Sequence, residues 1–281
     1  MCMRTLLILL ALFIPCTLMK AEEPIDNQVE NIDLHLNDHE AVVTFLGLSE
    51  GEAVLLQAAN GKNILINMGG KGTRAELEEG LSLYDVKEIS TLFLTNDDVS
   101  LDKIKQLISS YKIKEIITTS EISAQLTNEL KTINHIPILA WGAGTKKEIL
   151  PDMTAEVEFV GEESNEGMDL KLQFFNHTIF LMSSNSPRAE QVLMKKNLRN
   201  VNVFKIPNCS MEGPLSEQLI QYLNPEISIL FEGNNGMDTK TLRDLNEIWS
   251  EVYSTKKHGT VTVKFTENNY EVIRIPVKLD E

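Results

Sequence analysis

Cysteine is scarce in this 281-residue chain, which has only Cys2, Cys16 and Cys209. The first two lie in an N-terminal stretch with the layout of a secretory signal peptide, so its removal would leave Cys209 alone. A single cysteine cannot form an intrachain disulfide. The sequence therefore excludes the disulfide framework that often accompanies export.

The N-terminal stretch is short, basic at its start and then apolar. Met1–Arg4 is followed by an unbroken apolar run over 5–14, Pro15 ends the run, and the small residue Ala21 precedes an acidic segment. The run is too short to span a bilayer comfortably. We interpret residues 1–21 as a signal peptide and expect a secreted or cell-surface protein. An uncleaved anchor is the alternative, and lipidation at Cys16 is disfavoured by the preceding proline.

Basic residues are also few compared with acidic residues. The chain has 26 basic and 41 acidic residues, a formal charge of −15; without Arg4 and Lys20 the mature chain has 24 and 41, a charge of −17. Such a surface repels nucleic acid and anionic lipid at long range. The pairs Lys195-Lys196 and Lys256-Lys257 lack interleaved aromatic residues. We therefore expect an unidentified polar ligand or protein as partner, with membrane contact only through an uncleaved signal.

Only five histidines are present, and they are scattered. His177 sits in a predicted hairpin turn, and the others read as surface positions: His35, His39, His135 and His258. None falls in a loop that follows a predicted buried strand. A zinc site built from them is therefore disfavoured.

Hydrophobic residues make up 42% of the chain, enough for a substantial core. Residues 22–40 are an acidic lead-in with room for one edge strand, and we expect one domain over 41–281. In its first half the pattern predicts strands at 41–46, 53–58, 63–67, 89–95 and 113–119. Helices are predicted at 74–83, 101–111 and 120–131, with Ser100 as an N-cap.

The second half repeats this order. Strands are predicted at 155–160, 169–175, 178–182, 201–206, 227–231, 260–265 and 270–275, and helices at 187–198, 215–223 and 239–252. The segment that most resembles a linker between the two halves is 142–154. Each half is a strand meander followed by alternating helices and strands. This pattern predicts an α/β fold, an αββα sandwich of two packed mixed sheets with helices outside.

Several short segments occur in a fixed order: Phe45–Ala53 (FLGLSEGEA), Ile66–Gly69 (INMG), Thr95–Leu101 (TNDDVSL), Leu181–Asn185 (LMSSN), Val203–Met211 (VFKIPNCSM), then Asn234-Asn235, Tyr253–Thr255 and Gly259–Val261. Together they resemble the metallo-β-lactamase fold, and within it the domain of ComEC-type competence proteins and their secreted stand-alone relatives. The resemblance covers roughly 41–277. It implies a hydrolase with two zinc ions held by histidines and carboxylates at the strand ends.

The resemblance places the ligands on residues that suit zinc poorly. Family histidines fall on Asn96, Asp98, Leu101 and Asn208, ligand aspartates on Ser100 and Asn185, and supporting aspartates on Gly47 and Asn67. Of these positions, only Asp98 keeps ligand character. A neutral amide is a poor zinc ligand and leucine is none. We therefore expect no metal cofactor and treat Asn67, Asn96, Asp98, Ser100, Leu101, Asn185 and Asn208 as vestigial site positions.

The sequence contains three other candidate sites. Asp97, Asp98 and Asp102, with Cys209, could gather around a hard cation, but acidic residues before a helix capped by Ser100 explain them more simply. The 69–72 loop with Lys71 could cradle an anion, although it also reads as a plain loop after a hairpin. Cys209 has no neighbouring base in sequence to activate it.

The sequence thus favours a secreted pseudoenzyme that binds a polar ligand or a partner protein. Its face would be lined by Asn67, Asn96, Asp98, Asn185, Asn208 and Asn234. One alternative is a metal-dependent hydrolase with a rebuilt site, a phosphodiesterase or nuclease related to DNA uptake. Another is a purely structural envelope protein.

Overall fold

A computed structural model of the protein describes residues 31–130, 136–161, 163, 165–207, 213–231 and 238–276. The expected signal peptide lies outside these residues, as do His135, Asn208, Cys209 and the pair Asn234-Asn235. In the described part, no helix is both long enough and apolar enough to cross a membrane.

One mixed sheet, sheet A, takes strands from both ends of the chain. In the described residues its order is β15-β14-β1-β2-β3-β4-β5-β6. The segment from β15 to β3 is antiparallel, and β3 to β6 are parallel. The strands are β1 (Ala41–Phe45), β2 (Val54–Ala58), β3 (Asn63–Ile66), β4 (Thr91–Leu94), β5 (Glu115–Thr118), β6 (Ile138–Ala140), β14 (Thr260–Phe265) and β15 (Tyr270–Ile275).

The second mixed sheet, sheet B, has the order β13-β12-β11-β10-β9-β8-β7 in the described residues. Here β10 to β13 are parallel and β7 to β10 antiparallel. The strands are β7 (Lys146–Leu150), β8 (Met153–Val160), β9 (Met168–Phe174), β10 (His177–Leu181), β11 (Val203–Ile206), β12 (Ile227–Leu230) and β13 (Glu251–Ser254).

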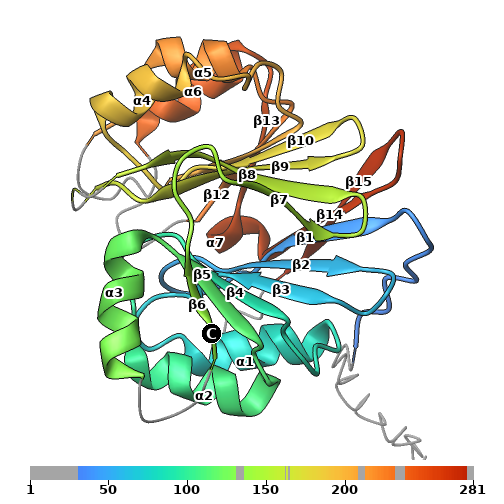
Figure 1. Cartoon of the computed structure of the whole chain (residues 1–281). Helices are drawn as coiled ribbons and strands as arrows, with labels where there is room; N and C mark the ends of the chain where they lie inside the picture. The colour runs from blue at the N-terminus through green and yellow to red at the C-terminus, as the bar shows by residue number, and fades with distance from the viewer. Residues whose placement is uncertain are drawn as a thin grey trace, which may run out of the picture. The chain divides into compact units, whose positions relative to one another are not determined.

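Helices cover the outer faces of both sheets. Figure 1 shows α1 and α2 below sheet A, α3 beside its β5 and β6 strands, and α4, α5 and α6 above sheet B, with the short α7 between the sheets. Their bounds are α1 (Arg74–Leu83), α2 (Leu101–Tyr111), α3 (Ser120–Glu129), α4 (Pro187–Leu193), α5 (Glu217–Leu223), α6 (Thr239–Glu247) and α7 (Thr255–His258). The predicted αββα sandwich is confirmed.

Three apolar clusters match these layers. The largest lies between the sheets and includes Phe45, Phe93 and Phe174. A second joins sheet A to helices α1 to α3, and a third joins sheet B to α4 to α6. Helix α2, for example, contributes an apolar stripe of Ile104, Leu107 and Ile108. Burial of both sheet faces explains why the parallel strands read as continuous apolar runs.

Several local predictions are correct to the residue. Helices α1 and α2 span the expected ranges, and the Ser100 hydroxyl accepts a hydrogen bond from Lys103 N at 3.5 Å as the N-cap of α2. The hairpin turn after β2 is also confirmed, since Gly61 has a φ of 75°. A positive φ of this kind is what an Asn-Gly turn requires.

The segment that resembled a linker is partly a strand. Lys146–Leu150 forms β7 and pairs antiparallel with β8 at one edge of sheet B. Its sequence, KKEIL, has three exposed residues followed by two buried ones, so it lacks the alternation of a typical strand. Only its pairing with β8 makes it one.

Two predicted helices end early. Helix α4 ends at Leu193, and Leu198 enters the core from a turn instead. Helix α6 ends at Glu247, because Trp249 adopts a φ of 62° that no helix tolerates. The chain then forms β13, which pairs in parallel with β12.

Two histidines are more buried, or placed differently, than the sequence predicts. His177 begins β10 and is buried, with Nε2 lying 3.1 Å from the carbonyl of Thr266. His258 is half-buried in α7, where its Nδ1 accepts the Ser254 N–H at 3.0 Å. His35 and His39 are exposed as predicted.

The described part of the lead-in, residues 31–40, contains no strand. Ile32 and Leu34 pack against the cluster under sheet A, and the Ile32 N–H donates to the Leu83 carbonyl at 2.7 Å. This part of the lead-in is therefore docked on the domain.

Candidate functional site

Polar side chains from both sheets meet where β3, β4 and β10 end and where the loop that leads into β2 ends. The Thr95 hydroxyl, after β4, lies 2.8 Å from the Ser183 hydroxyl, after β10. The Met168 N–H donates to the Thr95 carbonyl at 2.7 Å. A Cβ on Gly167 would lie only 2.2 Å from that carbonyl, so this approach of the two sheets requires glycine. We call this region the strand-end cluster: Glu52, Asn67, Thr95, Asn96, Asp169, Ser183 and Lys205.

Asn67 organises the part of the cluster on sheet A. It is buried, with a left-handed φ of 59° that asparagine tolerates better than most residues. Its Nδ2 donates at 2.8 Å to both Glu52 Oε1 and the Thr95 hydroxyl, and its Oδ1 accepts the Thr95 N–H at 2.9 Å. The amide oxygen and nitrogen are therefore both engaged within the protein.

A buried ion pair crosses between the sheets. The Lys205 ammonium, on β11, contacts the carboxylate of Glu52, and both residues are buried. Lys205 Nζ also donates to the Met182 carbonyl at 2.8 Å. Because Glu52 also accepts from Asn67 and, at 3.5 Å, from Asn96 Nδ2, its charge is compensated on several sides.

Asp169, the second residue of β9, is fully buried beside this pair. Its Oδ1 accepts the N–H groups of Ser183 and Ser184 at 2.7 and 2.9 Å, whereas no hydrogen-bond partner is described for Oδ2. Burial raises the pKa of Asp169 to about 7, against the opposing effects of these hydrogen bonds and of Lys205. This carboxyl is therefore close to half-protonated near neutral pH.

The loop after β4 separates the vestigial positions. Asn96 is half-buried and reaches Glu52, but Asp97 and Asp98 are exposed. Ser100 caps α2, and Leu101 packs into the cluster under sheet A. The structure thus brings Asn67 and Asn96 together and leaves the other positions of this loop pointing elsewhere.

The remaining positions are also dispersed. Asn185 Nδ2 donates to the Gly213 carbonyl at 3.3 Å, and its N–H donates to the Asn165 carbonyl at 2.7 Å. Gly47 donates its N–H to the Thr260 hydroxyl at 2.9 Å. Asn208 lies outside the described residues, so its place in this set stays a prediction.

The glycine loop after β3 holds a cation and leaves no anion cradle. The N–H groups of Gly69 and Gly70 donate to the carbonyls of Glu52 and Glu50 at 2.9 and 2.7 Å. The carbonyls of Met68 and Gly70 accept from the buried Lys103 ammonium at 3.0 and 2.7 Å. Lys71 is exposed. The anion-binding alternative is therefore wrong, because the loop presents its oxygens to α2.

Sequence reasoning missed the charged residues of this region: Glu52, Lys103, Asp169 and Lys205. A signal for two of them was present, since Lys205 is the only charge in the strand VFKI and Asp169 is the only acidic residue in the strand MDLKLQF. A charge inside a buried strand needs a partner. Which partner it finds depends on how the two sheets are packed.

The cluster does not suit the divalent ions that the fold family uses. Its amide oxygen at Asn67 is occupied by a backbone N–H, and its carboxylate at Glu52 is paired with an ammonium that would repel a dication. Among the described residues, no group of three or more His, Cys, Asp or Glu side chains could hold a metal ion. Asp97, Asp98 and Asp102 form no such group.

The sequence matches no protein-family model and no curated protein. Solved structures do match. The metallo-beta-lactamase fold protein YhfI from Bacillus subtilis is 12% identical with a TM-score of 0.59, covering 79% of this chain and 99% of its own. A diphosphatase from the PhnP family is 15% identical with a TM-score of 0.54, covering 80% and 97%. Zn(2+)-bound PqqB from Methylobacterium extorquens is 10% identical with a TM-score of 0.53, covering 76% and 97%. The chain has the metallo-β-lactamase fold.

Proposed function

We propose that this chain is an exported pseudoenzyme of the metallo-β-lactamase fold that binds a polar ligand or a partner protein. The observation that carries the proposal is the Lys205–Glu52 ion pair, linked through Asn67 to Thr95, in the strand-end cluster. An ammonium there supplies the positive charge that a metal ion would otherwise bring. The chain's charge of −15 supports a partner other than nucleic acid.

Metal content and hydrolysis test the proposal together. The purified protein is incubated with zinc and desalted, its metal is quantified by mass spectrometry, and hydrolysis of bis(p-nitrophenyl)phosphate is followed. We expect metal well below one ion per chain and no turnover above the buffer rate. A hydrolase with a rebuilt site would instead contain stoichiometric metal.

Asp98→Asn sharpens this test, because Asp98 is the one vestigial position with ligand character. We expect the variant to match the parent protein in metal content and in background turnover. Asp85→Asn is the control, since Asp85 is exposed and pairs with Lys87 away from the site. Stoichiometric metal, or turnover that disappears in Asp98→Asn alone, would overturn the proposal.

A further inference from the structure

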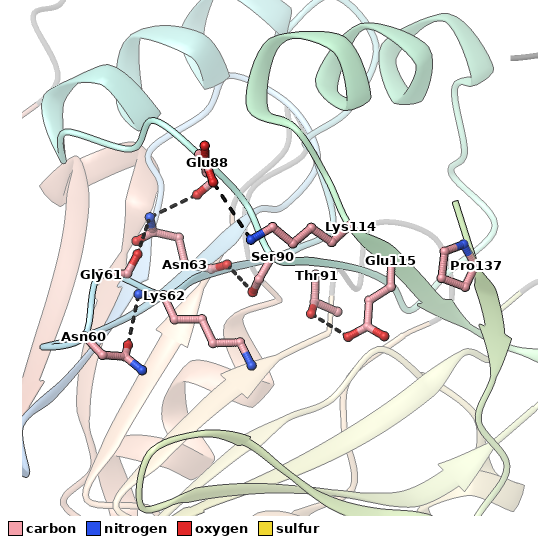
Figure 2. Close-up of a pocket in the computed structure, with 10 residues that line it drawn as sticks. All are labelled: Asn60, Gly61, Lys62, Asn63, Glu88, Ser90, Thr91, Lys114, Glu115 and Pro137. Atoms are coloured by element: carbon pink, nitrogen blue, oxygen red, sulfur yellow. Dashed lines mark hydrogen bonds and ion pairs between the residues drawn. The ribbon is translucent and has the colours of Figure 1, made fainter. Parts of the chain in front are cut away.

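A hollow lies at the opposite end of sheet A from the strand-end cluster, where the four parallel strands β3 to β6 begin. It has a volume of about 450 Å³, within the range of about 300–1,000 Å³ typical of small-molecule sites. Its lining comes from the β2–β3 turn and from the residues at or just before the starts of β3, β4, β5 and β6. Figure 2 shows Lys62 and Glu115 extending on either side of Thr91 in this view.

Most of the residues that line the hollow are polar or charged. It consists of Asn60, Gly61, Lys62, Asn63, Glu88, Ser90, Thr91, Lys114, Glu115 and Pro137. Asn63 is already satisfied, since its Nδ2 donates to the Gly61 and Glu88 carbonyls and its Oδ1 accepts from Gln57. Recognition there would therefore rely on the charged side chains.

The charges of the hollow are unequally paired. Glu88 receives the Lys112 ammonium at 2.6 Å and lies 3.9 Å from that of Lys114. The hydrogen bond from Lys112 is the main reason why the pKa of Glu88 is lowered. By contrast, Lys62 and Glu115 have no ion-pair partner in the part of the chain that the structure describes. Glu115 only accepts the Thr91 hydroxyl, at 2.9 Å.

We propose that this hollow binds a small zwitterion, a free α-amino acid, independently of the strand-end cluster. The ligand carboxylate would pair with Lys62 and Lys114, and its ammonium with Glu115. A simple anion would face the uncompensated Glu115 carboxylate, and a simple cation would face Lys62. Only a ligand with both charges pairs with both free groups, which is why a zwitterion is favoured.

Matched ligands test this without any variant. The common amino acids are screened for an increase in the melting temperature of the full chain, and the strongest is titrated by calorimetry beside its N-acetyl and carboxamide derivatives. Each derivative keeps one charge and loses the other. We expect both to bind at least tenfold more weakly than the zwitterion.

Two variants locate the site. Lys62→Met and Glu115→Gln should each weaken binding at least tenfold, because each leaves one ligand charge unpaired. Lys71→Met and Glu79→Gln are matched controls at exposed positions outside the hollow, and they should bind as the parent does. The proposal fails if no amino acid raises the melting temperature, if the N-acetyl derivative binds as tightly as the zwitterion, or if binding survives both pocket variants.

Discussion

The side chain of Asn67 joins the loop before β2 to the residue after β4, through Glu52 and Thr95. An aspartate there would place a second carboxylate against Glu52, whereas the amide can donate to it. At this position the chain thus has an amide nitrogen where an aspartate would have a carboxylate oxygen. That nitrogen converts a repulsive pair into a hydrogen bond.

Asp169 predicts an unusual pH dependence at the residue scale. Its pKa of about 7 in the folded protein lies above the unfolded value of about 3.9. The folded state therefore binds more protons between these values, and this residue's contribution to stability falls as pH rises through about 7. Between these two pKa values, ionisation of Asp169 should lower the free energy of unfolding by up to about 4 kcal/mol.

Asp169→Asn provides the comparison, because an amide keeps the acceptor for Ser183 and Ser184 but cannot ionise. Urea unfolding of both proteins is measured from about pH 5 to about pH 8. We expect the variant to gain stability relative to the parent as pH rises. A constant difference across this range would contradict the prediction.

At the scale of elements, α2 is fixed at its first turn by Ser100 and Lys103. Ser100 caps the helix, and Lys103 ties it to the loop after β3 through the carbonyls of Met68 and Gly70. Helix capping alone leaves the orientation of a helix undefined. The lysine adds a polar contact with the loop after β3 to the apolar packing of α2 on sheet A.

Lys103→Met should therefore destabilise the fold. It removes a charged donor from two buried carbonyls, and hydrogen bonds to charged groups contribute about 1.5–3 kcal/mol each. We expect a loss of at least about 3 kcal/mol in the free energy of unfolding, measured with urea. Lys105→Met on the same helix, where no side-chain partner is described, should change it by less than about 0.5 kcal/mol. Equal effects of the two substitutions would refute the role of Lys103.

At the scale of the whole molecule, the two sheets are joined by apolar packing across their faces and by polar contacts at the strand ends. The Lys205–Glu52 pair is a buried, charged part of that junction, with Lys205 on sheet B and Glu52 next to sheet A. A buried ion pair adds little net stability, but removing one partner leaves the other charge uncompensated in the interior.

Lys205→Met should cost about 3–5 kcal/mol, because Glu52 is left buried without its cation. The double variant Lys205→Met/Glu52→Gln should lose less, since no charge remains uncompensated. Lys146→Met is the control, because Lys146 forms an exposed pair with Glu156 at 3.5 Å that contributes at most about 1 kcal/mol. A double variant that loses as much stability as Lys205→Met, or more, would contradict a coupled pair.

The sequence predicted most elements because local patterns determine them. Alternating or continuous apolar runs predicted β1 to β5 and both C-terminal strands, and apolar stripes predicted α1 and α2 with their ends. The strands that were not predicted, β6, β7 and β13, all lie at sheet edges, where strand formation depends on a neighbour. KKEIL and EVYS pair at opposite edges of sheet B, and no local pattern encodes an edge pairing.

For the site, the sequence located the loops after β3, β4 and β10 through motif order, and it identified Asn67 and Asn96. It did not identify Glu52, Asp169 or Lys205, because those residues act only through partners far along the chain. Glu52 and Lys205 are paired across the two sheets. Whether a buried charge is a defect, a ligand or half of an ion pair is decided by that packing.

The sequence by itself determined the αββα class, the position of each long element and the lack of histidines in the strand-end loops. Only the tertiary structure decided that β14 and β15 complete sheet A beside β1, so that the two halves of the chain are not the two sheets. It also decided that the oxygens of the glycine loop face Lys103. The local sequence determines whether a segment forms a helix or a strand. Which strands pair, and which charged side chains pair, depends on how the buried surfaces and charges fit together in three dimensions.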